Sequence, residues 1–149
     1  MDLRARLRRS TWVKTFAALC LGALLVCSPA FAKVRISIIA GDTTPAVGQR
    51  VTIVVRSERR LEYDLRLIAV APGKPVFRVV ATITGDTSYP DPNIAHDGFE
   101  IQLTRIAPNR WRGSVRFRHA GRWRVVVPNE AREGVMMPAG AALLTLPVH

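Results

Sequence analysis

The chain has 149 residues, and its 22 Lys+Arg exceed its 11 Asp+Glu, giving a formal net charge of +11. This length suits one domain. An apolar fraction of 48% and a charged fraction of 22% exclude a disordered chain and a polytopic membrane protein. Two cysteines are too few for a disulfide-dense scaffold or a four-cysteine zinc site.

Residues 1–32 have the pattern of an export signal. Basic residues precede the apolar run 16–26, and Ala30 and Ala32 give the small-x-small pattern of a cleavage site. The run is too short to span a bilayer, which needs about 20 residues. An uncleaved anchor or a buried helix is the alternative. We expect cleavage after Ala32, export to the periplasm or the extracellular space, and a mature domain at 33–149 without cysteine.

After residue 32, apolar and polar side chains alternate, which predicts half-buried strands. The predicted strands are 33–39, 50–56, 61–70, 76–84, 99–105, 110–118, 122–127 and 143–148. Segments with glycine or proline separate them. A 3.6-residue period is not sustained anywhere, so we expect no helix longer than a turn or two. Seven or eight short strands in one domain predict an all-β, immunoglobulin-like sandwich of two sheets.

The segment 110–127 allows two topologies. It could form a hairpin around Gly121, which would place the arginines of both strands on one outer surface. Alternatively, residues 121–123 could be the corner where the chain crosses between sheets, with Trp123 in the place of a corner tyrosine. We favour the crossing, which divides the arginines between two surfaces.

The sequence favours binding over catalysis. It has no G-x-S-x-G, phosphate-binding loop, dinucleotide fingerprint or HExxH motif, and nothing singles out a nucleophilic serine. We therefore predict a protein that is not an enzyme.

Two long connections contain candidate metal ligands. In the loop 85–98, the carboxylates of Asp91 and Asp97 suit calcium, and His96 suits a transition metal. In the connection 129–140, Met136 and Met137 suit copper(I). The simpler interpretations, which we favour, are a solvated loop and methionines that fill gaps in the core.

Arginines are concentrated near the C-terminal end. Five of them are candidates for binding an anionic surface such as phospholipid head groups or acidic envelope polymers, namely Arg112, Arg116, Arg118, Arg122 and Arg124. The simpler alternative is a solvated face that acids partly neutralise, and the expected partners are Glu62, Asp64 and Glu100, with Glu100 beside Arg116. Export and inward-pointing aromatic residues argue against nucleic acid.

Residues 120–127 (AGRWRVVV), followed by a loop and a last strand, and the opening 46–53 (AVGQRVTI) resemble small exported bacterial domains. The YtkA-like, FixH-like and CopC-like families are similar in this way. The CopC resemblance implies copper binding through a histidine near the mature N-terminus and another in the last loop. The mature start Lys33 and the loop 129–134 have none, so only the fold carries over.

A FixH-like resemblance implies an accessory role. We thus predict an exported, non-enzymatic binding or accessory module of the bacterial envelope, whose partner is an envelope protein or an anionic envelope surface. The alternatives are a periplasmic copper carrier and an envelope structural protein that binds anionic surfaces.

Overall fold

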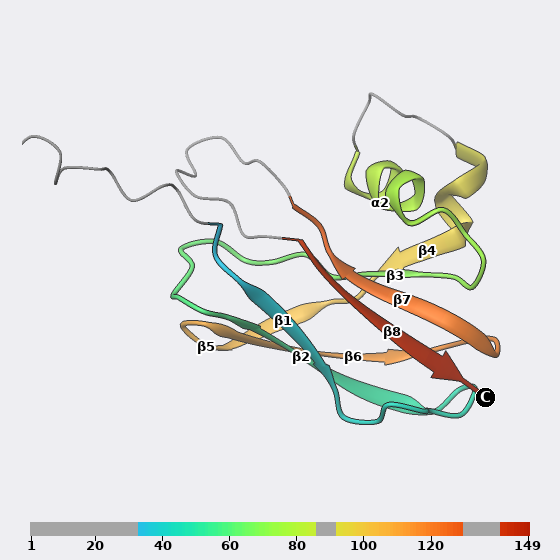
Figure 1. The fold of residues 1–149 in the computed structure, drawn as a ribbon, viewed down its shortest axis with the longest axis horizontal. Helices are drawn as coiled ribbons and strands as arrows, with labels where there is room; N and C mark the ends of the chain where they lie inside the picture. Colours follow the sequence, from blue (N-terminus) through green and yellow to red (C-terminus); the bar gives the residue numbers. More distant parts are fainter. Residues whose placement is uncertain (1–32, 86–91, 130–140) are drawn as a thin grey trace, which may run out of the picture. The chain divides into compact units, whose positions relative to one another are not determined.

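The computed structural model describes residues 33–85, 92–129 and 141–149, which form two antiparallel sheets of four strands each (Figure 1). One sheet has the order β1 (Ile36–Ala40), β2 (Arg50–Ser57), β6 (Arg110–Arg116), β5 (Leu103–Ala107). The other has the order β4 (Gly98–Glu100), β3 (Ile68–Val70), β7 (Gly121–Val127), β8 (Ala142–Val148). The predicted all-β sandwich is confirmed, while the predicted leader lies outside the described residues.

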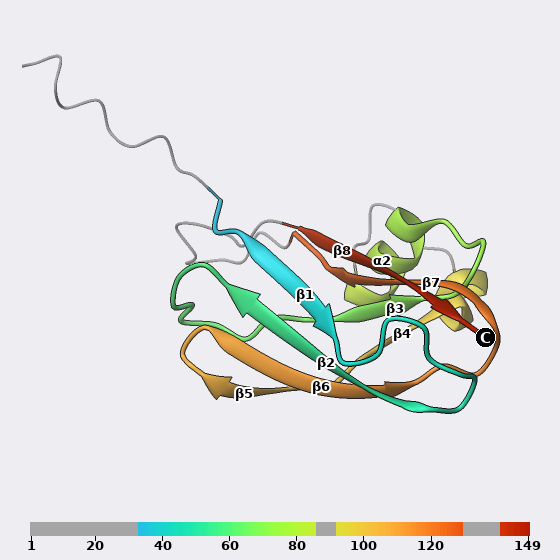
Figure 2. The ribbon, with the colours of Figure 1, turned by 60° about the horizontal axis from the view of Figure 1, so that its bottom comes forward.

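The strand order is that of the immunoglobulin fold. Lettered along the chain as A, B, C, C′, D, E, F and G, the strands form an A-B-E-D sheet and a C′-C-F-G sheet. Figure 2 shows β1, β2, β6 and β5 together in one layer.

The core lies between the two sheets and follows from the alternation in the sequence. In β2, Val51, Ile53 and Val55 are at most 1% exposed, and the residues between them face outward or are less buried. Trp111 is also fully buried, and its indole Nε1 donates to Asp64 Oδ1 at 3.0 Å. Burial of each such aliphatic side chain stabilises the fold by about 1.5–3 kcal/mol. Each strand is therefore most stable with its apolar residues turned toward the other sheet.

The chain crosses between the sheets at the β6–β7 connection. Strand β6 pairs with β2 and β5, whereas β7 pairs with β3 and β8. At the corner, Trp123 Nε1 donates to the carbonyl oxygen of His119 at 2.9 Å, the kind of bond that a corner tyrosine makes. The favoured crossing is confirmed, and the alternative hairpin is wrong.

The predicted strand 76–84 is an α-helix instead, α2 (Val76–Thr84). Its four larger aliphatic residues, Val76, Val79, Val80 and Ile83, are spaced i, i+3, i+4 and i+7, which is the helical period. Gly85 ends the helix in the left-handed conformation, and its N–H bonds to the last turn. The β-branched character of the four aliphatic residues suggested a strand, but their spacing allows them to share one face of a helix.

Two other predicted strands differ in extent. Only 68–70 of the predicted strand 61–70 is paired, as β3, although Leu61, Leu65 and Leu67 are buried as expected. The predicted strand 99–105 is divided between β4 and β5, because the chain passes from one sheet to the other at Ile101 and Gln102.

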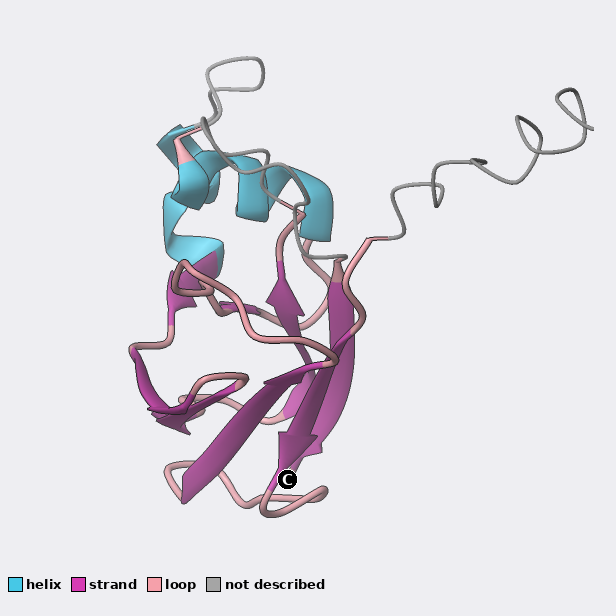
Figure 3. Cartoon of the chain, turned by 90° about the vertical axis from the view of Figure 1, so that its left-hand side faces the viewer, coloured by secondary structure: helices cyan, strands magenta, loops and turns pink. Residues whose placement is uncertain are grey.

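The helices cover part of one sheet. The α-helix α2 and the 3-10 helix η1 (Pro92–Asp97) lie together on one side of the strands (Figure 3). They pack on β3, where Ile68, Val70, Val79 and Ile94 form a second apolar cluster. The outward side chains of β2 and β6, in the other sheet, are mostly exposed. In the part of the chain that the structure describes, no helix has the length and apolar character needed to cross a membrane.

Candidate anion-binding face

The outer face of the β1–β2–β6–β5 sheet carries a concentration of arginines. Because side chains alternate along a strand, the burial of the inward residues leaves their neighbours on the outer side. All five outward arginines of β2 and β6 are exposed. We call them the arginine face, which consists of Arg50, Arg56, Arg110, Arg112 and Arg116.

The pairing of β2 with β6 brings these arginines together. Arg50 lies directly opposite Arg116, and Arg56 lies directly opposite Arg110. Arg112 lies between these pairs, opposite Val54. Like charges directly opposite each other on neighbouring strands destabilise a sheet, so these two pairs oppose folding unless something neutralises them.

Four acidic side chains form ion pairs away from the arginine face. Glu100 Oε2 accepts from Arg66 Nη2 at 2.8 Å, and Asp64 Oδ1 accepts from Arg105 Nε at 3.0 Å. Glu62 pairs with Arg60, and Asp97 pairs with Lys74. Among the described residues, none of these ion pairs includes a member of the arginine face.

The expected neighbour of Arg116 is therefore wrong. Glu100 belongs to β4 in the opposite sheet, and it bonds to Arg66 with both carboxylate oxygens. Arg116 instead donates from Nη1 to the carbonyl oxygen of Gly48 at 2.6 Å. That bond anchors one end of the arginine face and leaves the positive charge of Arg116 in place.

A depression of about 370 Å³ lies on the same face. Hydroxyl and amide groups surround it, together with one arginine of the face, and its lining includes Thr52, Gln102, Thr104, Arg112 and Ser114. Hydroxyl and guanidinium groups donate hydrogen bonds, and a guanidinium can bind phosphate or carboxylate oxygens in pairs. The depression therefore offers an oxyanion both charge and neutral donors.

The five arginines predicted for anionic-surface binding are separated by the fold. Arg112, Arg116 and Arg118 lie on or just after β6, whereas Arg122 and Arg124 lie on β7 in the other sheet. Arg122 is exposed. Arg124 is half-buried and donates from Nη2 to the carbonyl oxygen of Lys74, which gives it a structural role.

The sequence prediction missed Arg50, Arg56 and Arg110 as members of this surface. Their outward positions follow from alternation, and Arg50 and Arg56 stand at the two ends of the predicted strand 50–56. What the sequence lacked was the pairing of β2 with β6, which places strands more than fifty residues apart side by side.

The predicted metal ligands are only partly described. Asp91, Met136 and Met137 lie outside the described residues. His96 is exposed at the end of η1, and Asp97 Oδ1 is 3.1 Å from Lys74 Nζ. Within the described ranges, no three or more His, Cys, Asp or Glu side chains gather closely enough to hold a metal ion.

A second hollow, of about 320 Å³, is lined by residues from η1, β4, the end of β6, the β6–β7 connection and β7. We call it the histidine–arginine hollow, and its polar side chains are His96, Arg116, Arg118 and His119. Gly98, Phe99 and Trp123 complete its lining. The fold thus places His96, predicted as a metal ligand, beside two arginines predicted to bind anions.

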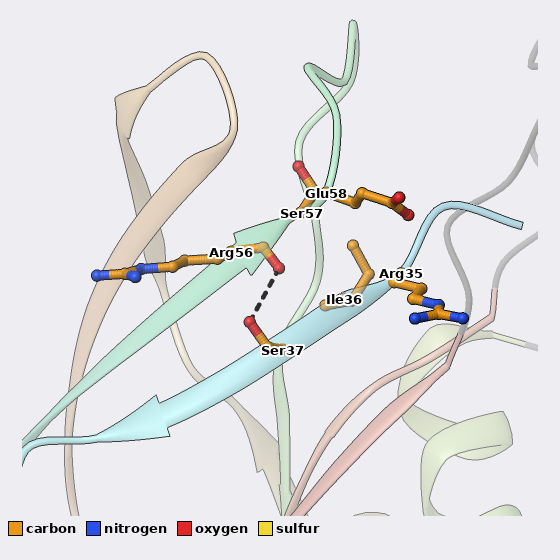
Figure 4. A pocket seen from close by; sticks show the side chains of 6 residues that line it. All are labelled: Arg35, Ile36, Ser37, Arg56, Ser57 and Glu58. Carbon is orange, nitrogen blue, oxygen red and sulfur yellow. Dashed lines mark hydrogen bonds between the residues drawn. The ribbon is translucent and has the colours of Figure 1, made fainter.

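A third hollow, of about 440 Å³, lies beside β1 and β2. Figure 4 shows Arg56 pointing to one side of this strand pair, while Arg35 and Glu58 point to the other. The Ser37 hydroxyl donates to the carbonyl oxygen of Arg56 at 3.5 Å. Because its charged side chains diverge, this hollow does not gather them around one ligand.

Comparison with known proteins leaves the family open. No protein-family model matches the sequence, and a search of curated proteins found no similar chain. The resemblance to YtkA-like, FixH-like and CopC-like domains therefore stays a prediction.

Proposed function

We propose that this chain is an exported, non-enzymatic binding module of the bacterial envelope, and that the arginine face docks on an anionic phospholipid surface. The observation that carries the proposal is the presence of two pairs of directly opposed arginines, Arg50 with Arg116 and Arg56 with Arg110. Their repulsion costs stability in the free protein and would be relieved against a layer of phosphate groups.

The apolar residues of the same face favour a lipid surface over an acidic polymer. Ile39 is 45% exposed and Ile106 is 42% exposed, and both lie among the outward positions of the sheet. A membrane interface accepts cationic and aliphatic groups side by side, because phosphates and the edge of the acyl region lie next to each other. An acidic polymer in water would offer the isoleucines little.

The test is vesicle sedimentation with protein produced from the full-length gene and purified after export. We expect binding to vesicles of phosphatidylglycerol and phosphatidylcholine, and little binding to phosphatidylcholine alone. Each arginine near an anionic surface contributes about 1 kcal/mol. The double substitution R110Q/R112Q should therefore weaken binding roughly 30-fold.

The matched control is R78Q/R122Q, which removes the same charge from the exposed surface of α2 and β7. It should retain most of the binding. Equal losses in the two variants, or equal binding to neutral vesicles, would contradict the proposal. Binding to a soluble acidic polysaccharide without vesicle binding would also overturn the lipid assignment.

A further inference from the structure

The histidine–arginine hollow combines cationic groups from separate parts of the chain. His96 comes from η1, Arg116 ends β6, and Arg118 and His119 belong to the connection that leads to β7. Within the described residues, no Asp or Glu is part of its lining. The nearest carboxylate in sequence, that of Asp97, is held by Lys74 at 3.1 Å. The hollow therefore concentrates positive charge without a carboxylate to neutralise it.

Its donors are available to a ligand. Arg118 is exposed, and among the described residues no hydrogen bond or ion pair occupies its guanidinium. Arg116 uses one N–H in its bond to Gly48, and a guanidinium has five. Imidazole N–H groups can add further donors at His96 and His119. A phosphate group, with three terminal oxygens and up to two negative charges, matches this set better than a carboxylate does.

Aromatic rings form the remaining walls. The ring of His119 stacks on Trp123, with centroids 5.6 Å apart and planes at 21°. Phe99 contacts the same indole edge to face, at 5.9 Å between centroids. Trp123 is held in turn by its hydrogen bond to the backbone of His119. These mutual contacts fix the orientation of His119, so this part of the wall is formed before any ligand arrives.

The size of the hollow exceeds what a lone phosphate needs. Sites for small organic molecules begin at about 300 Å³, and this hollow measures about 320 Å³. The half-buried ring of Phe99 and the exposed, stacked ring of His119 can contact a flat organic group.

We propose that the histidine–arginine hollow binds a small phosphate monoester with a flat organic group. Arg118 and Arg116 bind the phosphate oxygens, His96 and His119 add hydrogen bonds, and the rings contact the organic group. This site shares Arg116 with the arginine face, but Arg110 and Arg112, which the vesicle experiment changes, do not line it.

Isothermal titration calorimetry with phenyl phosphate tests the proposal on the exported protein. We expect saturable binding, weaker binding of inorganic phosphate because the ring contacts are missing, and no binding of phenol. A hydrogen bond to a charged group contributes enough that Arg118→Gln should weaken phenyl phosphate binding roughly 10- to 100-fold. His96→Asn should weaken it by a smaller factor.

The control R110Q/R112Q should bind phenyl phosphate as the unchanged protein does, even if it loses vesicle binding. Equal losses in R110Q/R112Q and Arg118→Gln would show only general charge attraction and overturn the proposal, as would no binding at ~10 mM phenyl phosphate. A titration with zinc or copper chloride tests whether the hollow binds a metal ion instead. Metal binding that His96→Asn abolishes and Arg118→Gln leaves intact, without phenyl phosphate binding, would make the hollow a metal site instead.

Vesicle binding and phenyl phosphate binding also separate the two possible sources of the phosphate. Arg118→Gln could lower the affinity for phosphatidic acid vesicles but not the affinity for phenyl phosphate. In that case the site binds the head group of a membrane lipid, and the soluble-ligand proposal is wrong. Loss of phenyl phosphate binding in Arg118→Gln, with vesicle binding retained, supports it. Failure of vesicle binding in the unchanged protein would overturn only the docking function.

Discussion

Arg105 shows that a single charged residue of this chain can serve the fold instead of the surface. Its Nε donates to Asp64, and its terminal nitrogens donate to the carbonyl oxygens of Leu61 and Tyr63. Its guanidinium lies 4.9 Å from the ring centroid of Trp111. The segment 61–64 pairs with no strand in the described structure, so Arg105, together with the hydrogen bond from Trp111 to Asp64, joins it to the β5–β6 side of the sandwich.

Replacing Arg105 with leucine should therefore destabilise the protein by about 2–3 kcal/mol, because two backbone carbonyls lose this donor and Asp64 loses one of its donors. Chemical denaturation measures this change in the free energy of unfolding. The control is Arg60→Leu in the same segment. Its ion pair with Glu62 is highly exposed, and such pairs contribute at most about 1 kcal/mol. Equal effects of the two substitutions would contradict the role given to Arg105.

At the scale of elements, α2 is the main addition to the sandwich and depends on close packing. Val79 is fully buried among the residues that cover β3. A Cβ at Gly98 would lie 2.6 Å from Val79 Cγ1, which shows how closely the helix approaches β4. The helix is rich in β-branched residues, whose intrinsic helix propensity is low, so this packing is what stabilises it.

Val79→Ala should destabilise the protein by roughly 1–3 kcal/mol, since it removes two buried methyl groups and leaves a cavity. Thermal or urea unfolding provides the measurement. Arg78→Ala changes the neighbouring exposed position of the same helix and should stay within about 0.5 kcal/mol of the unchanged protein. Far-UV circular dichroism gives a second test, because the folded protein should show a helical contribution from 76–84. If 76–84 were a strand, that contribution would be absent.

For the whole molecule, the distribution of charge is uneven. The ion pairs Arg66–Glu100, Arg105–Asp64 and Lys74–Asp97 use acids away from the outer surface of the β2–β6 pair. The arginine face keeps its charge, and it lies on the sheet opposite the one that carries α2 and η1. The two sides of the sandwich therefore differ: one is covered by helices, and the other presents arginines.

The predicted export also belongs to this scale. Intact-mass spectrometry of the protein recovered from the envelope should give a chain that begins at Lys33, because Ala30 and Ala32 provide the cleavage pattern. Such a product carries 17 Lys+Arg and 10 Asp+Glu, a net charge of +7. Substituting Ala32 with a bulky residue should slow this processing. Recovery of the full 149 residues from the cytosol would contradict the prediction.

The alternation of apolar and polar residues allowed the inward-facing residues of the strands to be predicted from the sequence. Val51, Ile53, Val55 and Trp111 were identifiable as core because successive side chains of a strand point to opposite sides, which is a local property of the backbone. The same rule gave the outward position of each arginine on β6. It failed at 76–84, where the aliphatic spacing fits a helix and β-branched residue types suggested a strand.

The sequence by itself determined the two-sheet, all-β architecture and the side of the strand on which each core residue lies. Only the tertiary structure decided that Arg50 faces Arg116, that Glu100 bonds to Arg66, and that His96 and Arg118 line one hollow. Side-chain alternation depends on neighbouring residues alone. Strand pairing and the gathering of a site depend on contacts between segments far apart in the chain, and these form only when the whole sandwich closes.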